Sequence, residues 1–235
     1  MRKQAICFAV GLLGVLLAHG QATNLAGYTN PVSRSFGVLV GTTGVGVEYY
    51  HPLGNQFGVQ AGVSFMPFGT KIVGTYGDYE TQSKVRARLH NVHALFGWTP
   101  FYQTDHFLRH FVVNVGASYL LRAEGGIDTR LSEPYYYGDI LVDQDMVGSV
   151  KTTVNWKQSV SPYFGIGLTD VRIDSRFGFN VGLGAYYLSS PSVRVKGTKL
   201  LEDNEANAPI IERNIKSYRV LPQVQLGVNY RLHIR

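Results

Sequence analysis

The feature that most constrains the fold is an alternation of apolar and polar residues that continues for longer than an ordinary strand. In residues 177–188 one face carries Phe179 and Val181, and the other carries Asn180 and Gly182. A period of two places successive side chains on opposite faces of a β-strand. Soluble strands usually have about 5 to 6 residues, whereas a tilted strand needs roughly 9 to 11 to cross a bilayer. The longest alternating stretches therefore predict membrane-spanning strands, and they are residues 111–122, 177–188 and 220–232.

Shorter alternating segments bring the predicted number of strands to eight. They are residues 36–41, 44–49, 57–65, 91–98 and 159–168. The boundary between the first two is the weakest of the set. Gly41-Thr42-Thr43-Gly44 separates them, and this segment is also compatible with a bend in one long strand.

The connections between these strands alternate in length. The short ones are residues 52–56, 100–107 and 169–176, and the long, polar ones are residues 69–84, 125–155 and 190–217. If both ends of the chain lie on one side of the membrane, all three long connections fall on the other side. Short periplasmic turns and long outer loops are the usual asymmetry of outer-membrane barrels.

The chemistry of the polar face indicates which face points outward. A soluble ligand-binding barrel also alternates, but its exposed face is usually rich in Lys, Glu and Thr. Here the polar face is mostly Gly, Asn, Ser and Gln, which suit an enclosed space, and aromatic residues cluster at the ends of the apolar faces. We therefore expect an all-β fold, a transmembrane antiparallel up-and-down barrel of about eight strands with its apolar face toward lipid.

The first twenty residues have the layout of a secretory signal peptide. Arg2 and Lys3 precede an apolar run over residues 5–17, and Ala18-His19-Gly20 supplies small residues at the cleavage positions. The run is too short for the ~20 residues of a transmembrane helix. We predict a signal peptide over 1–20, an N-terminal periplasmic segment over 21–33 and an outer-membrane β-barrel over 34–235.

Composition excludes several other classes of protein. The single cysteine, Cys7, leaves with the signal peptide, so the mature chain has no disulfide. Removing Arg2 and Lys3 from the 22 basic residues leaves 20 against 16 acidic ones, a net charge of +4 without a Lys/Arg block typical of nucleic-acid binding. No apolar window of the length of a transmembrane helix follows residue 20, so any span must consist of strands.

With this pattern the chain resembles the small outer-membrane β-barrel proteins of Gram-negative bacteria, loosely the OmpA/OmpX/OmpW-like group. The stretches that carry the resemblance are residues 41–48 (GTTGVGVE), 161–168 (SPYFGIGL), 177–184 (FGFNVGLG) and 221–232 (LPQVQLGVNYRL). The resemblance implies a porin-like barrel in the outer membrane, placed there by the barrel assembly machinery.

The candidate site is a polar network on the inner face of the barrel. Its predicted members are Glu48, His93, Asn114, Arg122 and Arg231. A carboxylate in a narrow barrel needs a partner, because an unpaired buried charge costs several kcal/mol. We expect Glu48 to form an ion pair with Arg122 or Arg231 that fixes the register of the strands.

Catalysis is the less favoured interpretation of the same face. A hydrolase needs a nucleophile, a base and an orienting group within hydrogen-bond reach. The candidates are Ser64, His93, Ser118, Ser159 and Ser161 with Glu48, and their spacing supports no such set. The histidines and acids at strand ends, His51, Asp105, His106 and His110, have no recurrent ligand spacing, so we expect neither a metal nor a cofactor.

The function we favour is non-enzymatic: an integral outer-membrane barrel with a structural or surface-interaction role. Arg86, Arg88, Arg122 and Lys151 fall at the expected outer rim, where they can meet lipopolysaccharide phosphates. The expected partners are outer-membrane lipid and lipopolysaccharide, without nucleic acid, and the barrel is expected to be monomeric. The alternative is a narrow channel or a binder of a small, hydrophobic molecule.

Overall fold

The computed structural model describes residues 33–77, 79–157 and 159–232. The predicted signal peptide lies outside these residues, as does the predicted periplasmic segment apart from its last residue. The described residues belong to one compact unit.

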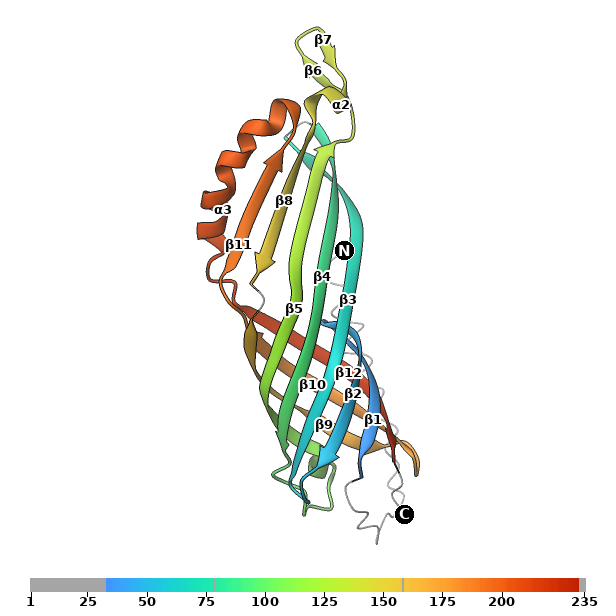
Figure 1. The fold of residues 1–235 in the computed structure, drawn as a ribbon. Coiled ribbons are helices and arrows are strands. Elements are labelled where there is room, and N and C mark those ends of the chain that lie inside the picture. The colour runs from blue at the N-terminus through green and yellow to red at the C-terminus, as the bar shows by residue number, and fades with distance from the viewer. Residues whose placement is uncertain (1–32, 78, 158, 233–235) are drawn as a thin grey trace. The chain divides into compact units, whose positions relative to one another are not determined.

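Eight strands form a closed antiparallel ring (Figure 1). In ring order they are β1 (Ser35–Gly41), β2 (Gly44–Pro52), β3 (Phe57–Tyr76), β4 (Tyr79–Trp98), β5 (Phe111–Leu131), β9 (Val160–Arg172), β10 (Phe177–Tyr187) and β12 (Val220–Arg231). The pairing of β1 with β12 closes the ring, since Phe36 lies opposite Tyr230. Each strand neighbours the next ring strand along the chain, so the predicted up-and-down barrel is confirmed.

The boundary between β1 and β2 is a tight turn rather than a bend. Thr42 and Thr43 connect the two strands, and Gly41 lies opposite Gly44. Gly44 has a φ of +96°, and a Cβ on it would lie 2.0 Å from the Phe65 carbonyl oxygen. Only glycine fits such a position, and the predicted split between the two strands is therefore correct.

The inner and outer faces of the barrel are those that the alternation predicts. Val38, Val47 and Val115 are exposed on the outer face, whereas Asn114 and Glu48 are buried on the inner face. An aromatic row crosses four strands near the periplasmic end, in agreement with the expected girdle. Its members are Tyr49, Phe36, Tyr230 and Phe177, which lie opposite one another in register.

The long connections are not the loops that their polarity suggested. β3 and β4 continue beyond the barrel as one hairpin, in which Tyr76 lies opposite Tyr79. The outer half of β5 pairs with β8 (Ser149–Trp156), and β8 pairs with β11 (Pro191–Gly197). The prediction of loops over 69–84, 125–155 and 190–217 was therefore wrong for most of these residues, although their placement on one side of the barrel was correct.

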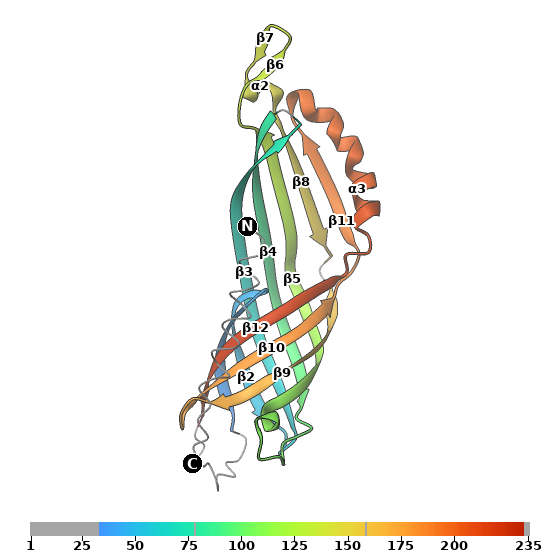
Figure 2. The ribbon, with the colours of Figure 1, turned by 180° about the vertical axis from the view of Figure 1, so that it is seen from behind.

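These strands form an extension, which we call the extracellular sheet. It consists of the outer halves of β3, β4 and β5 together with β8 and β11, and it stands above one side of the barrel (Figure 2). Pairing along β4 continues from the barrel into the sheet, without interruption against β3 and with one bulge against β5. The sheet is therefore a continuation of the barrel wall.

Short elements complete the outer end. A two-stranded hairpin, β6 (Tyr135–Tyr137) and β7 (Ile140–Val142), precedes the short helix α2 (Gln144–Val147). The 3-10 helix η2 (Lys199–Asn207) continues into α3 (Ala208–Ile215), whose Glu212 accepts a hydrogen bond from the Val193 N–H of β11 at 2.9 Å. At the other end, η1 (Phe107–His110) precedes β5. Within the described residues, none of the helices combines the length and apolar character of a membrane-spanning helix.

Candidate functional site: the bore and the extracellular sheet

A chain of hydrogen bonds crosses the bore between four strands. Asn180 donates to Glu48 Oε1 at 3.3 Å, and Gln225 donates to Glu48 Oε2 at 3.4 Å. The amide oxygen of Asn180 accepts from the Asp170 backbone N–H at 2.9 Å. Gln223 extends the chain by donating to Gln225 at 2.6 Å. The network therefore links β2, β9, β10 and β12 across the interior.

Asp170 is one of the network members that were not predicted, as are Asn180, Gln223 and Gln225. The Arg231 Nε lies 2.8 Å from its carboxylate, and Asn229 donates to the same oxygen at 3.2 Å. Asp170 lies at a β-bulge opposite Asn180, where the register between β9 and β10 shifts, and its φ is +52°. The bulge turns its side chain into the bore, whereas residues 169–176 were predicted to form a short turn.

The ion pair expected for Glu48 is not formed. Its carboxylate is held by the two amides of Asn180 and Gln225, and Arg231 pairs with Asp170 instead. Amide donors satisfy the carboxylate oxygens without placing a second buried charge beside them. The prediction of an arginine partner for Glu48 was wrong.

Arg122 lies outside the bore. An extra residue in β5 shifts the register against β4, so that His90 pairs with Arg122 while Asn91 pairs with Leu120. Because a one-residue slip exchanges the two faces of a strand, Arg122 turns outward and binds Glu124 at 2.8 Å. Its inclusion in the inner network was therefore incorrect.

The other predicted members, His93 and Asn114, are both buried on the inner face. His93 Nδ1 lies 3.3 Å from the Asn91 amide oxygen, and Asn91 donates to Ser64 at 2.7 Å. This group on β3 and β4 is a second polar cluster, with no hydrogen bond to the Glu48 network among the described residues. The space for the His93 ring depends on glycine, because a Cβ on Gly62 would lie 2.7 Å from His93 Nε2.

The candidate catalytic set is not assembled. Ser118 donates to the Val92 carbonyl, Ser159 to the Lys157 carbonyl, and His93 contacts Asn91. No hydrogen bond joins a serine to a histidine, and no cluster of metal-ligating side chains occurs, in the parts of the chain that the structure describes. These residues have the geometry of a packed polar interior.

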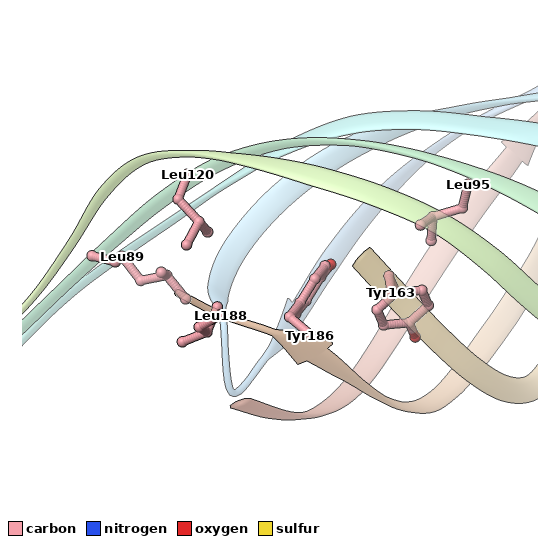
Figure 3. Packing of buried hydrophobic residues seen from close by; sticks show 7 residues of the cluster. Leu89, Leu95, Leu120, Tyr163, Tyr186 and Leu188 are labelled. Carbon is pink, nitrogen blue, oxygen red and sulfur yellow. The ribbon is translucent and has the colours of Figure 1, made fainter. Parts of the chain in front are cut away.

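An apolar layer fills the outer part of the bore (Figure 3). The rings of Tyr163 and Tyr186 are 4.7 Å apart between centroids. Inward glycines make room for these rings, since a Cβ on Gly165 or Gly184 would lie 2.3 Å from the Tyr163 hydroxyl. The remaining members of the layer are Leu89, Leu95, Leu120, Ala123 and Leu188. Large side chains thus occupy the space that the glycines leave.

The outer face of the extracellular sheet is strongly basic. Cross-strand register and alternation place nine basic residues on the face that continues the apolar outer surface of the barrel. They are Lys71, Lys84, Arg86, Arg88, Arg122, Arg130, Lys151, Arg194 and Lys196, and the acidic residues on this face are Glu80, Glu124 and Asp128. We call this surface the basic face.

The pKa of the Glu124 carboxyl reflects the positive charge around it. A hydrogen bond from Arg122 lowers the pKa of the Glu124 carboxyl, and the nearby charges of Arg88 and Lys151 lower it further. Arg88 lies directly opposite Glu124 in the pairing of β4 with β5. The contacts agree with the face assignment from the register.

The sequence does contain the signal for this surface. In residues 84–89 the basic residues Lys84, Arg86 and Arg88 alternate with Val85 and Leu89. The alternation matches a strand with one basic and one apolar face. Arg86, Arg88 and Lys151 were predicted at the outer rim, but the polarity of the neighbouring segments favoured loops there.

Comparison with known proteins shows the fold. The structure is similar to the crystal structure of CarO from Acinetobacter baumannii, with a TM-score of 0.62 and 20% sequence identity over 86% of this chain and 98% of that chain. CarO2 from the same organism also gives a TM-score of 0.62, with 17% identity over 86% of this chain and 100% of that chain. No family model and no curated protein sequence matches the chain. The fold is therefore that of a Gram-negative outer-membrane β-barrel.

Proposed function

We propose that the protein is an integral outer-membrane barrel that supports the envelope by binding lipopolysaccharide through its basic face. The proposal rests on the position of the basic face, which begins directly where the apolar outer surface of the barrel ends. The apolar outer surface ends at Phe65, Tyr119 and Leu121, which are exposed. Beyond Phe65 and the His90 that lies opposite it, the next outward-facing residue of β4 is Arg88, and Arg122 follows Leu121 on β5.

Cations at this height match the chemistry of the outer leaflet. A residue directly above the hydrocarbon region lies at the level of lipid phosphates, and arginine binds phosphate through two parallel N–H groups. Arg86 and Arg88 are exposed, and neither forms an ion pair within the described residues. The two arginines thus remain available for an anionic lipid.

The packed bore argues against bulk diffusion as the function. Barrels of eight strands have an interior only wide enough for side chains or one small ligand. Here the Glu48 network and the Tyr163–Tyr186 layer cross that interior. An envelope-binding role requires no passage through the bore.

Binding of purified lipid A to the detergent-solubilised protein, measured by native mass spectrometry, tests the proposal. Each cation near a membrane surface contributes about 1 kcal/mol, so R86Q/R88Q should bind lipid A about 30-fold more weakly. The matched control is R213Q/K216Q, which removes the same charge from exposed positions at the end of α3. If the two double variants lose affinity equally, or neither does, the proposal fails.

A second candidate function has one observation in its favour. The inner face of the extracellular sheet carries apolar side chains, of which Phe68, Ile72 and Ile127 are exposed. Such a patch fits a binder of small hydrophobic molecules. Saturable binding of a fluorescent fatty acid that is abolished by Ile127→Asp would favour this candidate over the first.

A further inference from the structure

Four lysines on the basic face lie in one straight row across the extracellular sheet. Lys71 is directly opposite Lys84, Lys84 opposite Asp128, Asp128 opposite Lys151, and Lys151 opposite Lys196. The row therefore crosses β3, β4, β5, β8 and β11. All of its members belong to one face, because residues in direct register share a face.

The row contains two like-charge pairs. Lys71 and Lys84 form one pair, and Lys151 and Lys196 form the other. Like charges directly opposite each other destabilise a sheet. The ion pairs of the described residues are Arg122–Glu124 and Arg231–Asp170, and Asp128, the acidic residue of the row, lies opposite only one lysine of each pair. An anion from outside the chain is the group that would relieve both repulsions.

Asp128 divides the row into two separate positions. It stands between Lys84 and Lys151, where its carboxylate repels an anion placed at the centre. The midpoints of the two lysine pairs are three strand spacings apart, which corresponds to about 14 Å. On each side a basic residue lies two positions away on the same face, Arg86 beside Lys84 and Arg194 beside Lys196. Each position thus combines two ammonium groups with a guanidinium.

The height of the row separates it from the lipid phosphates. Asp128 is six residues beyond Arg122 along β5, which corresponds to about 20 Å of extended strand. A group at that distance from the hydrocarbon boundary lies among sugars rather than among lipid headgroups. Arg88 is nearer to the boundary and remains a lipid-level contact, and Arg86 lies between the two levels.

We propose that the lysine row is a two-position site for a phosphorylated oligosaccharide, whose two phosphates bind the Lys71–Lys84 and Lys151–Lys196 pairs. The inference rests on the proposed function, since the oligosaccharide is the sugar portion of the same glycolipid. It adds a second binding region, at the height of the sugars, that recognises two phosphates a set distance apart. Lysine is suited to this task because its flexible stem accommodates a ligand of variable geometry.

The test uses deacylated, phosphorylated core oligosaccharide and the same oligosaccharide after removal of its phosphates by hydrogen fluoride. Binding to the full chain in phosphatidylcholine nanodiscs is measured by titration calorimetry. The wild type should bind the phosphorylated form and not the dephosphorylated one. K71Q/K84Q and K151Q/K196Q should each lose about tenfold in affinity, because each removes two exposed cations, whose ion pairs with a solvated phosphate are weaker than those at the membrane surface. The control R213Q/K216Q should bind within twofold of the wild type.

The outcomes separate this inference from the proposed function. Lipid A binding should be unchanged in both lysine variants, whereas R86Q/R88Q should lose it. If lipid A binding behaves as expected but neither lysine variant changes oligosaccharide affinity, the lysine site is overturned and the lipid-level contact stands. Equal binding of the dephosphorylated oligosaccharide, or an equal loss in R213Q/K216Q, also overturns it.

The single variants K71Q and K196Q separate a loss of the site from a folding defect. Lys71 and Lys196 stand at the ends of the row, where their only neighbour in it is another lysine. K71Q and K196Q should therefore leave the unfolding temperature of the ligand-free protein unchanged or raised. A marked fall in that temperature contradicts the assignment of these lysines as a repelling pair.

Discussion

Asp170→Asn isolates the contribution of the charge at the periplasmic end of the bore. Asn has the size of Asp and, like Asp, tolerates the left-handed conformation at φ +52°. The substitution therefore keeps the bulge while removing the negative charge beside Arg231. The guanidinium then remains with a neutral acceptor in place of a carboxylate.

The expected magnitude follows from burial and geometry. Removing one partner of a fully buried ion pair costs about 3 to 5 kcal/mol. The Arg231 side chain is 9% exposed, but the Asp170 side chain is 33% exposed, so water screens part of the interaction. The Asn amide oxygen can still accept one of the guanidinium N–H groups. We therefore expect a loss of about 2 kcal/mol in the free energy of unfolding.

Urea unfolding of the barrel refolded in phosphatidylcholine vesicles measures this loss by linear extrapolation. Asp105→Asn is the matched control, an exposed aspartate in a short turn on the same side of the barrel, and it should change stability by less than about 0.5 kcal/mol. Adding R231Q to D170N should cost less than the sum of the two single changes, because the pair acts as a unit. A D170N variant as stable as the D105N control would refute the reasoning.

Three further predictions concern export, packing and conduction. The mature protein should begin at Gln21, and the intact mass of the membrane-extracted protein tests this. A mass that includes Met1 would contradict the predicted signal peptide. Gly62→Ala should destabilise the barrel by about 1 to 3 kcal/mol, because its Cβ would lie 2.7 Å from His93 Nε2, whereas Gly74→Ala meets nothing within 4 Å and should be neutral in urea unfolding. Planar bilayers containing the wild type should show no large, steady current, and a porin-sized conductance would contradict the packed bore.

The alternation predicted the barrel because the bilayer imposes one rule on every spanning strand. An apolar face toward lipid and a polar face toward the bore produce a period of two that can be recognised in single segments such as 177–188. Strand number, the direction of the connections and the two faces of the barrel all derive from it. Outside the bilayer the rule ends, and polar segments such as 69–84 no longer differ in composition from loops.

The errors in the candidate site have local causes. A bulge adds one residue to β5 and places Arg122 on the outer face instead of the predicted inner face. A second bulge, in β9, turns Asp170 inward. An alternating stretch of sequence does not reveal where a bulge inserts an extra residue. The sequence also does not show which carboxylate pairs with Arg231. Its pairing with Asp170 rather than Glu48 depends on which strands become neighbours in the closed ring.

The most direct test of the account is the environment of two adjacent residues on β5. Cys7 is the only cysteine of the chain and precedes the predicted cleavage position, so single cysteines at positions 114 and 115 can carry spin labels in the mature protein. Val115 is exposed on the outer face, and Asn114 is buried in the bore. In vesicles, the label at 115 should collide frequently with oxygen, which concentrates in lipid, and rarely with a water-soluble nickel chelate, while the label at 114 should be shielded from lipid. The reverse pattern, with 114 in contact with lipid and 115 shielded, would contradict the barrel orientation on which every other inference depends.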